Sequence, residues 1–365
     1  MSNDVFDYGA RLGRLREQMR GASVDVVMLS VGSDLPYFTG YEAMPSERLT
    51  TLVVPSDGEA VLFVPKLERA RVEPGPFEVV PWAETEDPIR LVARLANGAR
   101  HIAIGDHTWS TFLLGLQTEL RDAEWSVAST LTKPLRMRKE PGEIDLLRAA
   151  AEGVDRVLAR VPLEIRFSGR TEREVARDFQ EMTVTEGHDV ASFAIIASGP
   201  NGASPHHEPG DRTITEGDLV VCDFGGRVGG YFSDATRTFS VGEATARQIE
   251  VHGLVLAANE AGRAAVAPGV PCQEIDRAAR RVISDGGYGE YFIHRTGHGI
   301  GLEVHEHPYL VEGNDLALEP GMTFSVEPGI YLPGELGVRI EDIVACGARE
   351  VDDLNRSGRQ LVNVS

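Results

Sequence analysis

Apolar residues in the first third of the chain recur at alternating helix and strand spacings. Helical spacing predicts helices over residues 8–21, 88–96 and 111–120. Short apolar runs predict strands at 24–29, 50–54, 60–64, 102–105 and 125–128. The second and third strands are joined by Pro55-Ser56-Asp57-Gly58, which has the residues of a tight hairpin turn. This alternation predicts a small α/β layer of roughly 130 residues.

The remainder of the chain follows a different plan, with longer helices and a second set of strands. Helices are expected over residues 143–161, from a capping box at Thr171 and Glu174 to about 186, and over 244–266 and 272–285. Strands are expected at 194–197, 219–224 and 231–241, and further strands and turns follow the last helix. A polar loop rich in glycine and proline follows residue 197.

The composition changes between these two parts at KPLRMRKEPGE, residues 133–143, a basic stretch punctuated by proline and glycine. We place the connection between domains there, which predicts one domain at 1–132 and a second at 144–365. The chain of 365 residues is long enough for two such domains.

Composition and charge exclude several classes of protein. The hydrophobic content of 42% permits a sizeable core, and the formal net charge of −20 argues against nucleic acid or an anionic membrane as partner. Neither a signal peptide nor a membrane-spanning run is expected, because the N-terminus lacks basic and apolar regions and the other apolar runs are short. Three cysteines without framework spacing predict reduced thiols and a cytoplasmic setting.

The stretch RTGHGIGLEVHEHP, residues 295–308, carries the first chemical signal. Glycines on both sides of His298 let the backbone fold tightly and leave the imidazole unobstructed. The stretch is not a dinucleotide-binding loop, because its glycines fall at 297, 299 and 301 and no helical pattern follows.

Four carboxylates lie on or beside apolar strands elsewhere: Asp223, Asp234, Glu327 and Glu341. Acids in such positions are costly unless they are paired or bound to metal. Each acid alone also fits a strand-end turn or a surface carboxylate, and His298 alone fits a turn histidine. Together the five side chains are a ligand set for two divalent metals, provided that the fold brings them together.

These residues resemble the pita-bread metallopeptidases, specifically the prolidases and Xaa-Pro aminopeptidases. The motifs cover about residues 139–353 and match two aspartates on a hairpin, a GHG-type histidine, a glutamate before Pro-Gly and a glutamate in an IED-type strand. The resemblance implies an α/β (α+β) chain with a creatinase-like N-terminal domain and a pita-bread catalytic domain. It also implies that Asp234 and Glu341 bridge two metals, with Asp223 completing one site and His298 and Glu327 the other.

The resemblance further implies a reaction. Oxygen-rich ligation with one imidazole favours Mn²⁺, although Co²⁺ or Zn²⁺ would also bind. A hydroxide bridging the two metals would attack the carbonyl before the proline, with Glu327 as proton shuttle. His206 and His305 would contact the substrate or the developing oxyanion, whereas the adjacent His207 and His307 would have no such role.

Three more residues are assigned by hypothesis. Arg339 shares a strand face with Glu341, so it is expected to steady a carboxylate beside the substrate. Tyr231 fits either a pocket wall or a core position. Arg48 follows an aromatic stretch in the N-terminal domain, and we hypothesise that it binds a substrate carboxylate, although it also fits a solvated arginine beside Glu47.

The sequence is therefore expected to encode a cytoplasmic Xaa-Pro dipeptidase that takes small peptides with proline second and, as in the family, forms a homodimer. The alternatives are an Xaa-Pro aminopeptidase for longer peptides, a creatinase-like hydrolase without metal, and a binding protein that has lost its metals. The five retained ligand positions argue against the last two. A methionine aminopeptidase is disfavoured by the large N-terminal domain.

Overall fold

The structure, a computed structural model, describes residues 6–365 and divides into two compact units. The first unit ends at Arg136, and the second runs from Met137 to Ser365. Within residues 6–365, none of the helices has the length and apolar character needed to cross a membrane.

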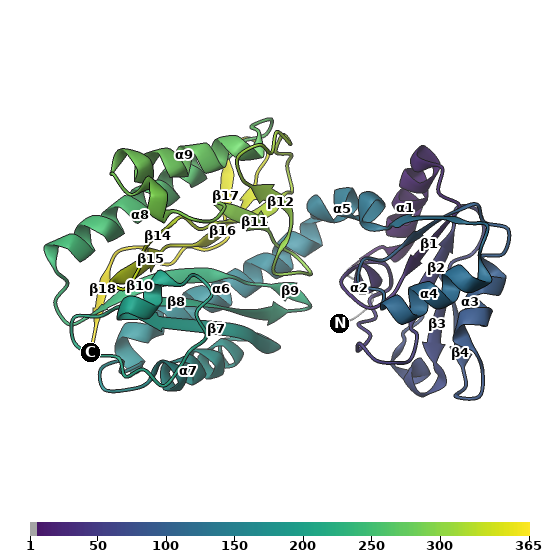
Figure 1. Cartoon of the computed structure of the whole chain (residues 1–365), viewed down its shortest axis with the longest axis horizontal. Helices are drawn as coiled ribbons and strands as arrows, with labels where there is room; N and C mark the ends of the chain where they lie inside the picture. Colours follow the sequence, from purple (N-terminus) through teal and green to yellow (C-terminus); the bar gives the residue numbers. More distant parts are fainter. Residues whose placement is uncertain (1–5) are drawn as a thin grey trace. The chain divides into compact units, whose positions relative to one another are not determined.

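A mixed sheet of six strands forms the centre of the first unit, in the order β4-β3-β2-β1-β5-β6 (Figure 1). In chain order the strands are β1 Val26–Leu29, β2 Thr51–Pro55, β3 Val61–Pro65, β4 Glu78–Trp82, β5 His101–Ile104 and β6 Glu124–Val127. The helices are α1 Tyr8–Ala22, α2 Asp34–Thr39, η1 Lys66–Arg71, α3 Pro88–Leu95, α4 Ser110–Glu119 and α5 Ser129–Met137. Strand β1 pairs antiparallel with β2 and parallel with β5, which makes the sheet mixed.

Apolar alternation explains how this sheet acquires its core. Val92 of α3 and Leu116 of α4 are buried in one cluster with Met28, Val53 and Ile102 from three neighbouring strands. Both helices therefore cover the same face of the sheet, as Figure 1 shows.

The helices and strands predicted for this unit are observed within a few residues, but α2, η1, β4 and α5 were not predicted. Strand β4 contains Pro81, and proline is tolerated in a sheet only where its missing N–H is not needed, as on this edge strand. Helix α5 contains Pro134, and α6 begins at Pro141, so the prolines that suggested an irregular connection lie inside one helix and at the start of the next.

Two sheets and a hairpin make up the strand layers of the second unit. One sheet has the order β18-β10-β8-β7 with β9 paired to β8, the other has the order β12-β11-β13-β16-β17, and β14 pairs with β15. The strands are β7 Val190–Ser198, β8 Leu219–Val228, β9 Tyr231–Phe232, β10 Ala235–Val241, β11 Gly297–Gly299, β12 Glu306–Leu310, β13 Thr323–Val326, β14 Gly329–Leu332, β15 Leu336–Arg339, β16 Asp342–Cys346, β17 Val351–Asp353 and β18 Val362–Val364.

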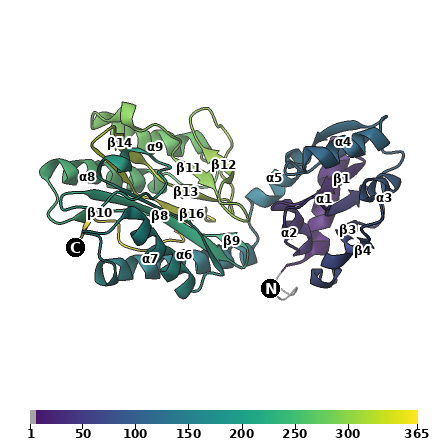
Figure 2. The same cartoon turned by 60° about the horizontal axis from the view of Figure 1, so that its bottom comes forward.

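Two pairs of helices enclose these strands. The helical segments are α6 Pro141–Glu164, α7 Glu172–Thr185, η2 Gly199–Ala203, α8 Ala246–Ala264, α9 Cys272–Asp285 and η3 Gly289–Tyr291. Helices α6 and α7 share a core with β7, β8 and β10, whereas α8 and α9 pack on β13 to β16. Figures 1 and 2 show the two helix pairs on opposite sides of the strand layers. The strands, and the side chains at their ends, therefore lie between the two pairs.

Local capping fixes where these helices begin. The Thr171 hydroxyl accepts from the backbone N–H of Glu174, and the Glu174 carboxylate accepts from the N–H of Thr171, so the predicted capping box is confirmed. The same reciprocal pattern starts α8 at Thr245 and Gln248.

Close approach of β12 and β13 to β11 explains the glycine-rich stretch. A Cβ atom on Gly297 would overlap the carbonyl oxygen of Ser325, and one on Gly299 would overlap the carbonyl oxygen of His307. The His298 amide, between them, donates to the Ser325 hydroxyl at 3.0 Å. Both glycines are therefore required by the distance between backbones, and this packing holds His298 in place.

We expect Gly297→Ala to lower the free energy of unfolding by about 2–3 kcal/mol, because the added methyl group must displace the Ser325 backbone. Gly253→Ala is the matched control, because its Cβ meets nothing within 4 Å on an exposed helix position, and about 0.5–1 kcal/mol of stabilisation is expected there. Urea unfolding measures both changes. Equal stability of Gly297→Ala and wild type would contradict the packing argument.

Candidate metal centre

Five side chains predicted as metal ligands reach one cavity from different strands of the second unit. Asp223 lies in β8, and Asp234 lies in the turn between β9 and β10. His298 is the middle residue of β11, Glu327 follows β13, and Glu341 precedes β16. All five line the same cavity, so the structure brings together residues that are up to 118 positions apart (223 to 341).

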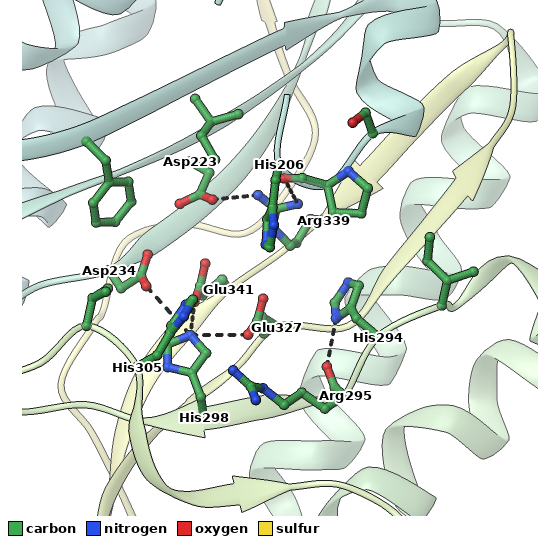
Figure 3. A pocket seen from close by; sticks show the side chains of 16 residues that line it. His206, Asp223, Asp234, His294, Arg295, His298, His305, Glu327, Arg339 and Glu341 are labelled. Atoms are coloured by element: carbon green, nitrogen blue, oxygen red, sulfur yellow. Dashed lines mark hydrogen bonds and ion pairs between the residues drawn. The ribbon is translucent and has the colours of Figure 1, made fainter. Parts of the chain in front are cut away.

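The distances define three overlapping groups of possible ligands (Figure 3). His298 Nε2 lies 3.3 Å from Glu327 Oε1, 3.8 Å from Asp234 Oδ2 and 3.9 Å from Glu341 Oε1. The groups are His298, Glu327 and Glu341; Asp223, Asp234 and Glu341; and Asp234, His298 and His305, each with ligand atoms within 4.8 Å of one another. Glu341 and Asp234 each belong to two of the groups, as a bridging ligand must.

Three of the four acids each have one buried oxygen without a hydrogen-bond partner within the described protein. In residues 6–365, Asp223 Oδ1, Asp234 Oδ1 and Glu341 Oε1 are buried and have no hydrogen-bond partner. A buried charged oxygen without a partner is strongly destabilising, and a divalent cation is the partner that such an oxygen-rich set prefers. The residues therefore fit divalent metal ions on chemical grounds.

The electrostatics of the acids agree with this interpretation. Burial and the neighbouring charge of Glu341 raise the pKa of Asp234 well above its ordinary value. Burial and the charge of Glu327 do the same to the pKa of Glu341, and burial raises the pKa of Glu327 to about 7. Without a cation, the protein must keep protons on this set, because like charges in a buried cavity repel.

His298 is held as a neutral imidazole with a free nitrogen facing the acids. Burial lowers its pKa to about 3, so the ring is uncharged at neutral pH. Nδ1 lies 3.1 Å from the carbonyl oxygen of Gly299 and therefore carries the hydrogen. Nε2 is left with its lone pair pointing at the carboxylates, which is the form in which histidine binds metals.

Arg339 connects two of the acids from behind the cavity. Its Nη2 donates to Asp223 Oδ2 at 2.6 Å, and its Nε donates to the Thr236 hydroxyl at 3.1 Å. That hydroxyl in turn donates to Glu341 Oε2 at 2.7 Å. The remaining guanidinium N–H groups point to Tyr331 Oη and to the carbonyl oxygen of Pro205. Arg339 lines the cavity, but its donors are used to orient the acids.

Other cavity-lining residues were not identified from the sequence. The cavity has a volume of about 830 Å³ and is also lined by Phe193, Ile195, Ser204, Pro205, Ile293, His294, Arg295 and Val304. Arg295 opens the glycine-rich stretch and stacks over Tyr309, with its guanidinium carbon 4.1 Å from the ring centroid. Ile293 is 64% exposed, which only the structure reveals, and its one signal in the sequence was its place two residues before the histidine motif.

His206 and His305 lie at the exposed edge of the cavity. The ring of His305 packs edge-on against His298, with 4.1 Å between ring centroids. Burial, followed by the charges of Arg295 and His206, lowers the pKa of His305. A ring nitrogen of His305 also lies within 4.8 Å of possible ligand atoms of Asp234 and His298, so geometry alone allows it near a metal.

Comparison with known proteins accounts for both units. The model for "Metallopeptidase family M24" matches residues 145–348, and the model for "Creatinase/Prolidase N-terminal domain" matches residues 11–138. The chain belongs to metallopeptidase family M24. The predicted family and fold class are thereby confirmed: a creatinase-type α/β domain precedes a pita-bread domain.

Relatives of this M24 peptidase are similar over nearly their whole length. The "Probable dipeptidase PepE" of Mycobacterium tuberculosis is 43% identical over 99% of this chain and 98% of the relative. The crystal structure of dipeptidase PepE from Mycobacterium ulcerans is 41% identical, with a TM-score of 0.92 over 99% of both chains. The structure of a prolidase from Thermococcus sibiricus is 37% identical, with a TM-score of 0.94 over 98% of this chain and all of that one.

Two residues with hypothesised substrate roles have other partners in the M24 peptidase. Tyr231 does not line the cavity in the described part of the chain; it is buried, and its hydroxyl donates to Glu143 Oε1 at 2.8 Å. Arg48 forms ion pairs with Glu47 and, at 2.7 Å, with Glu84 in its own unit. In the structure, both side chains are therefore bound to acids of the protein itself.

The raised pKa of Glu327 predicts a pH-dependent stability difference in the metal-free protein. A group whose pKa rises on folding from 4.5 to about 7 stabilises the fold fully below pH 4.5, and this stabilisation is lost as the pH rises through about 7. Glu327→Gln cannot ionise, so in a chelator it should become more stable than wild type by about 3 kcal/mol above that pH. Denaturant unfolding at several pH values measures the difference.

With added Mn²⁺, wild type should instead be more stable than Glu327→Gln, because an ionised carboxylate binds the cation more strongly than a neutral amide does. A stability difference between wild type and Glu327→Gln that is the same at acidic and alkaline pH would contradict the assignment of a raised pKa to Glu327.

Proposed function

We propose that this M24 peptidase hydrolyses the bond before proline in small peptides, and that Xaa-Pro dipeptides are its main substrates. The observation that supports this most strongly is the buried set of four acids around neutral His298, in a cavity large enough for a dipeptide. The naming of its full-length relatives as dipeptidase and prolidase supports the substrate class.

In this proposal, Asp223, Asp234 and Glu341 would hold one divalent metal, and His298, Glu327 and Glu341 would hold the second. Asp234 Oδ2 lies 3.8 Å from His298 Nε2, so Asp234 would be shared by the two sites, as Glu341 would be. Mn²⁺ suits the oxygen-rich set best, with Co²⁺ or Zn²⁺ as alternatives. Such metals, when bound, acidify water and polarise a peptide carbonyl.

The remaining chemistry belongs to side chains of the chain itself. Glu327 accepts a proton from the attacking water at a carboxylate oxygen and passes it to the leaving nitrogen. The proline nitrogen of an Xaa-Pro bond carries no hydrogen, so it must be protonated before it can leave as an amine. His206 and His305, at the exposed edge of the cavity, donate hydrogen bonds to the substrate and to the developing oxyanion.

In this proposal, Arg339 contributes to the reaction by holding the metal-binding carboxylates in place. Its hydrogen bonds to Asp223 and, through Thr236, to Glu341 set the carboxylate orientations before the substrate binds. Preorganised charges need not rearrange during the reaction, and this lowers its barrier. Arg339 therefore acts on the substrate mainly through the acids, and Tyr231 supports the fold through Glu143.

Three further proposals concern the whole protein. We place it in the cytoplasm because its three cysteines are free and buried, as is usual in a reducing compartment. We propose a homodimer, by analogy with the family, and we retain the division into domains 1–132 and 144–365 with the connection at 133–143. The alternative substrate class is longer peptides with proline second.

Paired substrates decide between the two substrate classes. The dipeptide Met-Pro and the tripeptide Met-Pro-Ala are each assayed with metal-stripped protein and again after Mn²⁺ is restored. We expect no turnover without metal and, with metal, a kcat/KM for Met-Pro at least about tenfold above that for Met-Pro-Ala, which corresponds to about 1.4 kcal/mol.

Faster cleavage of the tripeptide would assign the protein as an Xaa-Pro aminopeptidase. Absence of cleavage of either peptide in the presence of Mn²⁺ would reject a proline-specific peptidase and leave another amide as the substrate.

Arg48 provides a test of the preference for dipeptides. If its guanidinium binds the free carboxylate of the proline, Arg48→Ala should raise KM for Met-Pro about tenfold, the usual effect of losing one charged hydrogen bond. Arg71→Ala is the matched control, because Arg71 also pairs with an acid of the first unit, Glu68, at 2.7 Å. Unchanged kinetics for Arg48→Ala would reject the role.

A further inference from the structure

A buried carboxylate outside the candidate metal centre organises the loop that carries His206. Glu172 is the first residue of α7, and its side chain is 0% exposed. It faces the segment 198–210, the polar loop that runs from the end of β7 past the edge of the cavity. A buried acid in this position needs hydrogen-bond donors, and this segment supplies them.

Five donors from the segment converge on this carboxylate. Oε1 accepts from the Ser198 amide at 2.8 Å, the Ser198 hydroxyl at 2.7 Å and the Asn201 side chain at 3.0 Å. Oε2 accepts from His207 Nε2 at 2.7 Å and the Gly210 amide at 3.2 Å. Burial opposes ionisation, but the bonds from Ser198 and His207 outweigh it and hold the pKa of Glu172 below its usual range.

His206 lies between two fixed points of this loop. On one side, His207 is bound to Glu172. On the other, the carbonyl oxygen of Pro205 accepts a hydrogen bond from Arg339 Nη1 at 3.3 Å. Arg339 also binds Asp223, so the backbone on both sides of His206 is tied to buried charged groups. His206 and Arg339 are both among the side chains that line the cavity (Figure 3).

A second contact fixes the depth of the loop. A Cβ atom on Gly202 would lie 2.9 Å from the backbone nitrogen of Gly337, and one on Gly337 would overlap the carbonyl oxygen of Gly202. The backbone of the loop is therefore packed directly on β15, the strand that ends with Arg339. With its backbone pinned in this way, His206 has few ways to move except rotation of its own side chain.

We propose that Glu172 and His207 are positioning residues, which set the imidazole of His206 for contact with substrate. The assignment rests on the proposed function, because the role of His206 itself does. It also gives His207 a function that the sequence did not indicate. The hydrogen bond from His207 Nε2 to Glu172 attaches the loop to the start of α7 and so holds the neighbouring residue, His206, in place.

The test uses His207, which is 20% exposed in its side chain, because Glu172 is too buried for its substitution to separate positioning from folding. His207→Phe keeps a ring but removes the donor, whereas His207→Gln retains an N–H near the position of Nε2. Each variant is made alone and together with His206→Ala. All proteins are loaded with Mn²⁺, and kcat and KM for Met-Pro, bound metal and thermal unfolding are measured.

We expect His206→Ala to lower kcat/KM about 100-fold and His207→Phe to lower it about tenfold, with bound metal unchanged. In the double variant the two losses should not multiply, and kcat/KM should stay within about twofold of His206→Ala alone. His207→Gln should recover most of the rate lost by His207→Phe. His101→Phe, a control in the first unit where the histidine also makes two hydrogen bonds, should stay within about twofold of wild type.

Losses that multiply in the double variant would overturn the proposal, because His207 would then act independently of His206. Loss of metal or a fall in thermal stability in His207→Phe would also overturn it, since the effect would be structural. If wild type with Mn²⁺ fails to cleave Met-Pro, the proposed function fails and hydrogen exchange decides the inference. Amides of residues 199–210 should then exchange about tenfold faster in His207→Phe than in wild type, and equal rates would overturn the positioning role.

Discussion

Repulsion among four carboxylates in one buried cavity is the constraint on which the second unit depends. Asp223, Asp234, Glu327 and Glu341 surround one neutral imidazole, and three of their oxygens lack a partner in residues 6–365. Protons or divalent cations can balance the negative charge of such a set. The pKa values of Asp234, Glu327 and Glu341 are raised because ionising these buried carboxyl groups without a cation is unfavourable. The scaffold must therefore hold these acids together against their own charges.

The contrast between neighbouring acids shows how the scaffold does this. Asp342 follows Glu341 directly and is equally buried, yet Arg237 and Arg359 hold its pKa below the ordinary value despite that burial. Arg237 Nη2 and Arg359 Nε each lie 2.7 Å from an oxygen of Asp342, and Arg237 Nη1 also binds the carbonyl oxygen of Glu341. Asp342 therefore anchors the strand with both oxygens satisfied, whereas its neighbour Glu341 keeps one oxygen without a hydrogen-bond partner in residues 6–365. Glu172, with its five donors, is satisfied as Asp342 is.

The number of hydrogen-bond donors separates Glu172 and Asp342 from the acids of the candidate metal centre. A buried carboxylate with a full set of donors costs little and fixes a backbone segment, as Glu172 does for the loop of His206. A buried carboxylate that keeps one oxygen without a donor, as Asp223, Asp234 and Glu341 do within residues 6–365, destabilises the fold unless a proton or a cation balances its charge. The acids of the candidate metal centre lie in a strand or directly next to the end of one, whereas the histidines that are proposed to contact the substrate lie at the exposed edge of the cavity.

The sequence by itself determined the local elements and the identity of the candidate ligands. Apolar spacing, the Thr171 capping box and the glycines around His298 are short-range signals, and each depends on residues a few positions apart. Helix α5 and strand β4 were missed because Pro134 and Pro81 are read as breakers unless the surrounding structure is known. The resemblance to a known family was needed to connect Asp223 with Glu341, because nothing in the intervening residues encodes their distance.

Only the tertiary structure decided which side chains face the cavity and which are bound elsewhere. The Tyr231 hydroxyl donates to Glu143. The Arg339 guanidinium donates to Asp223, to Thr236 and to the carbonyl oxygen of Pro205. His207, adjacent to His206, is bound to a carboxylate 35 residues away in the sequence. Such choices depend on the packing of distant strands and helices, and on the requirement that every buried polar group find a partner, so no local pattern contains them.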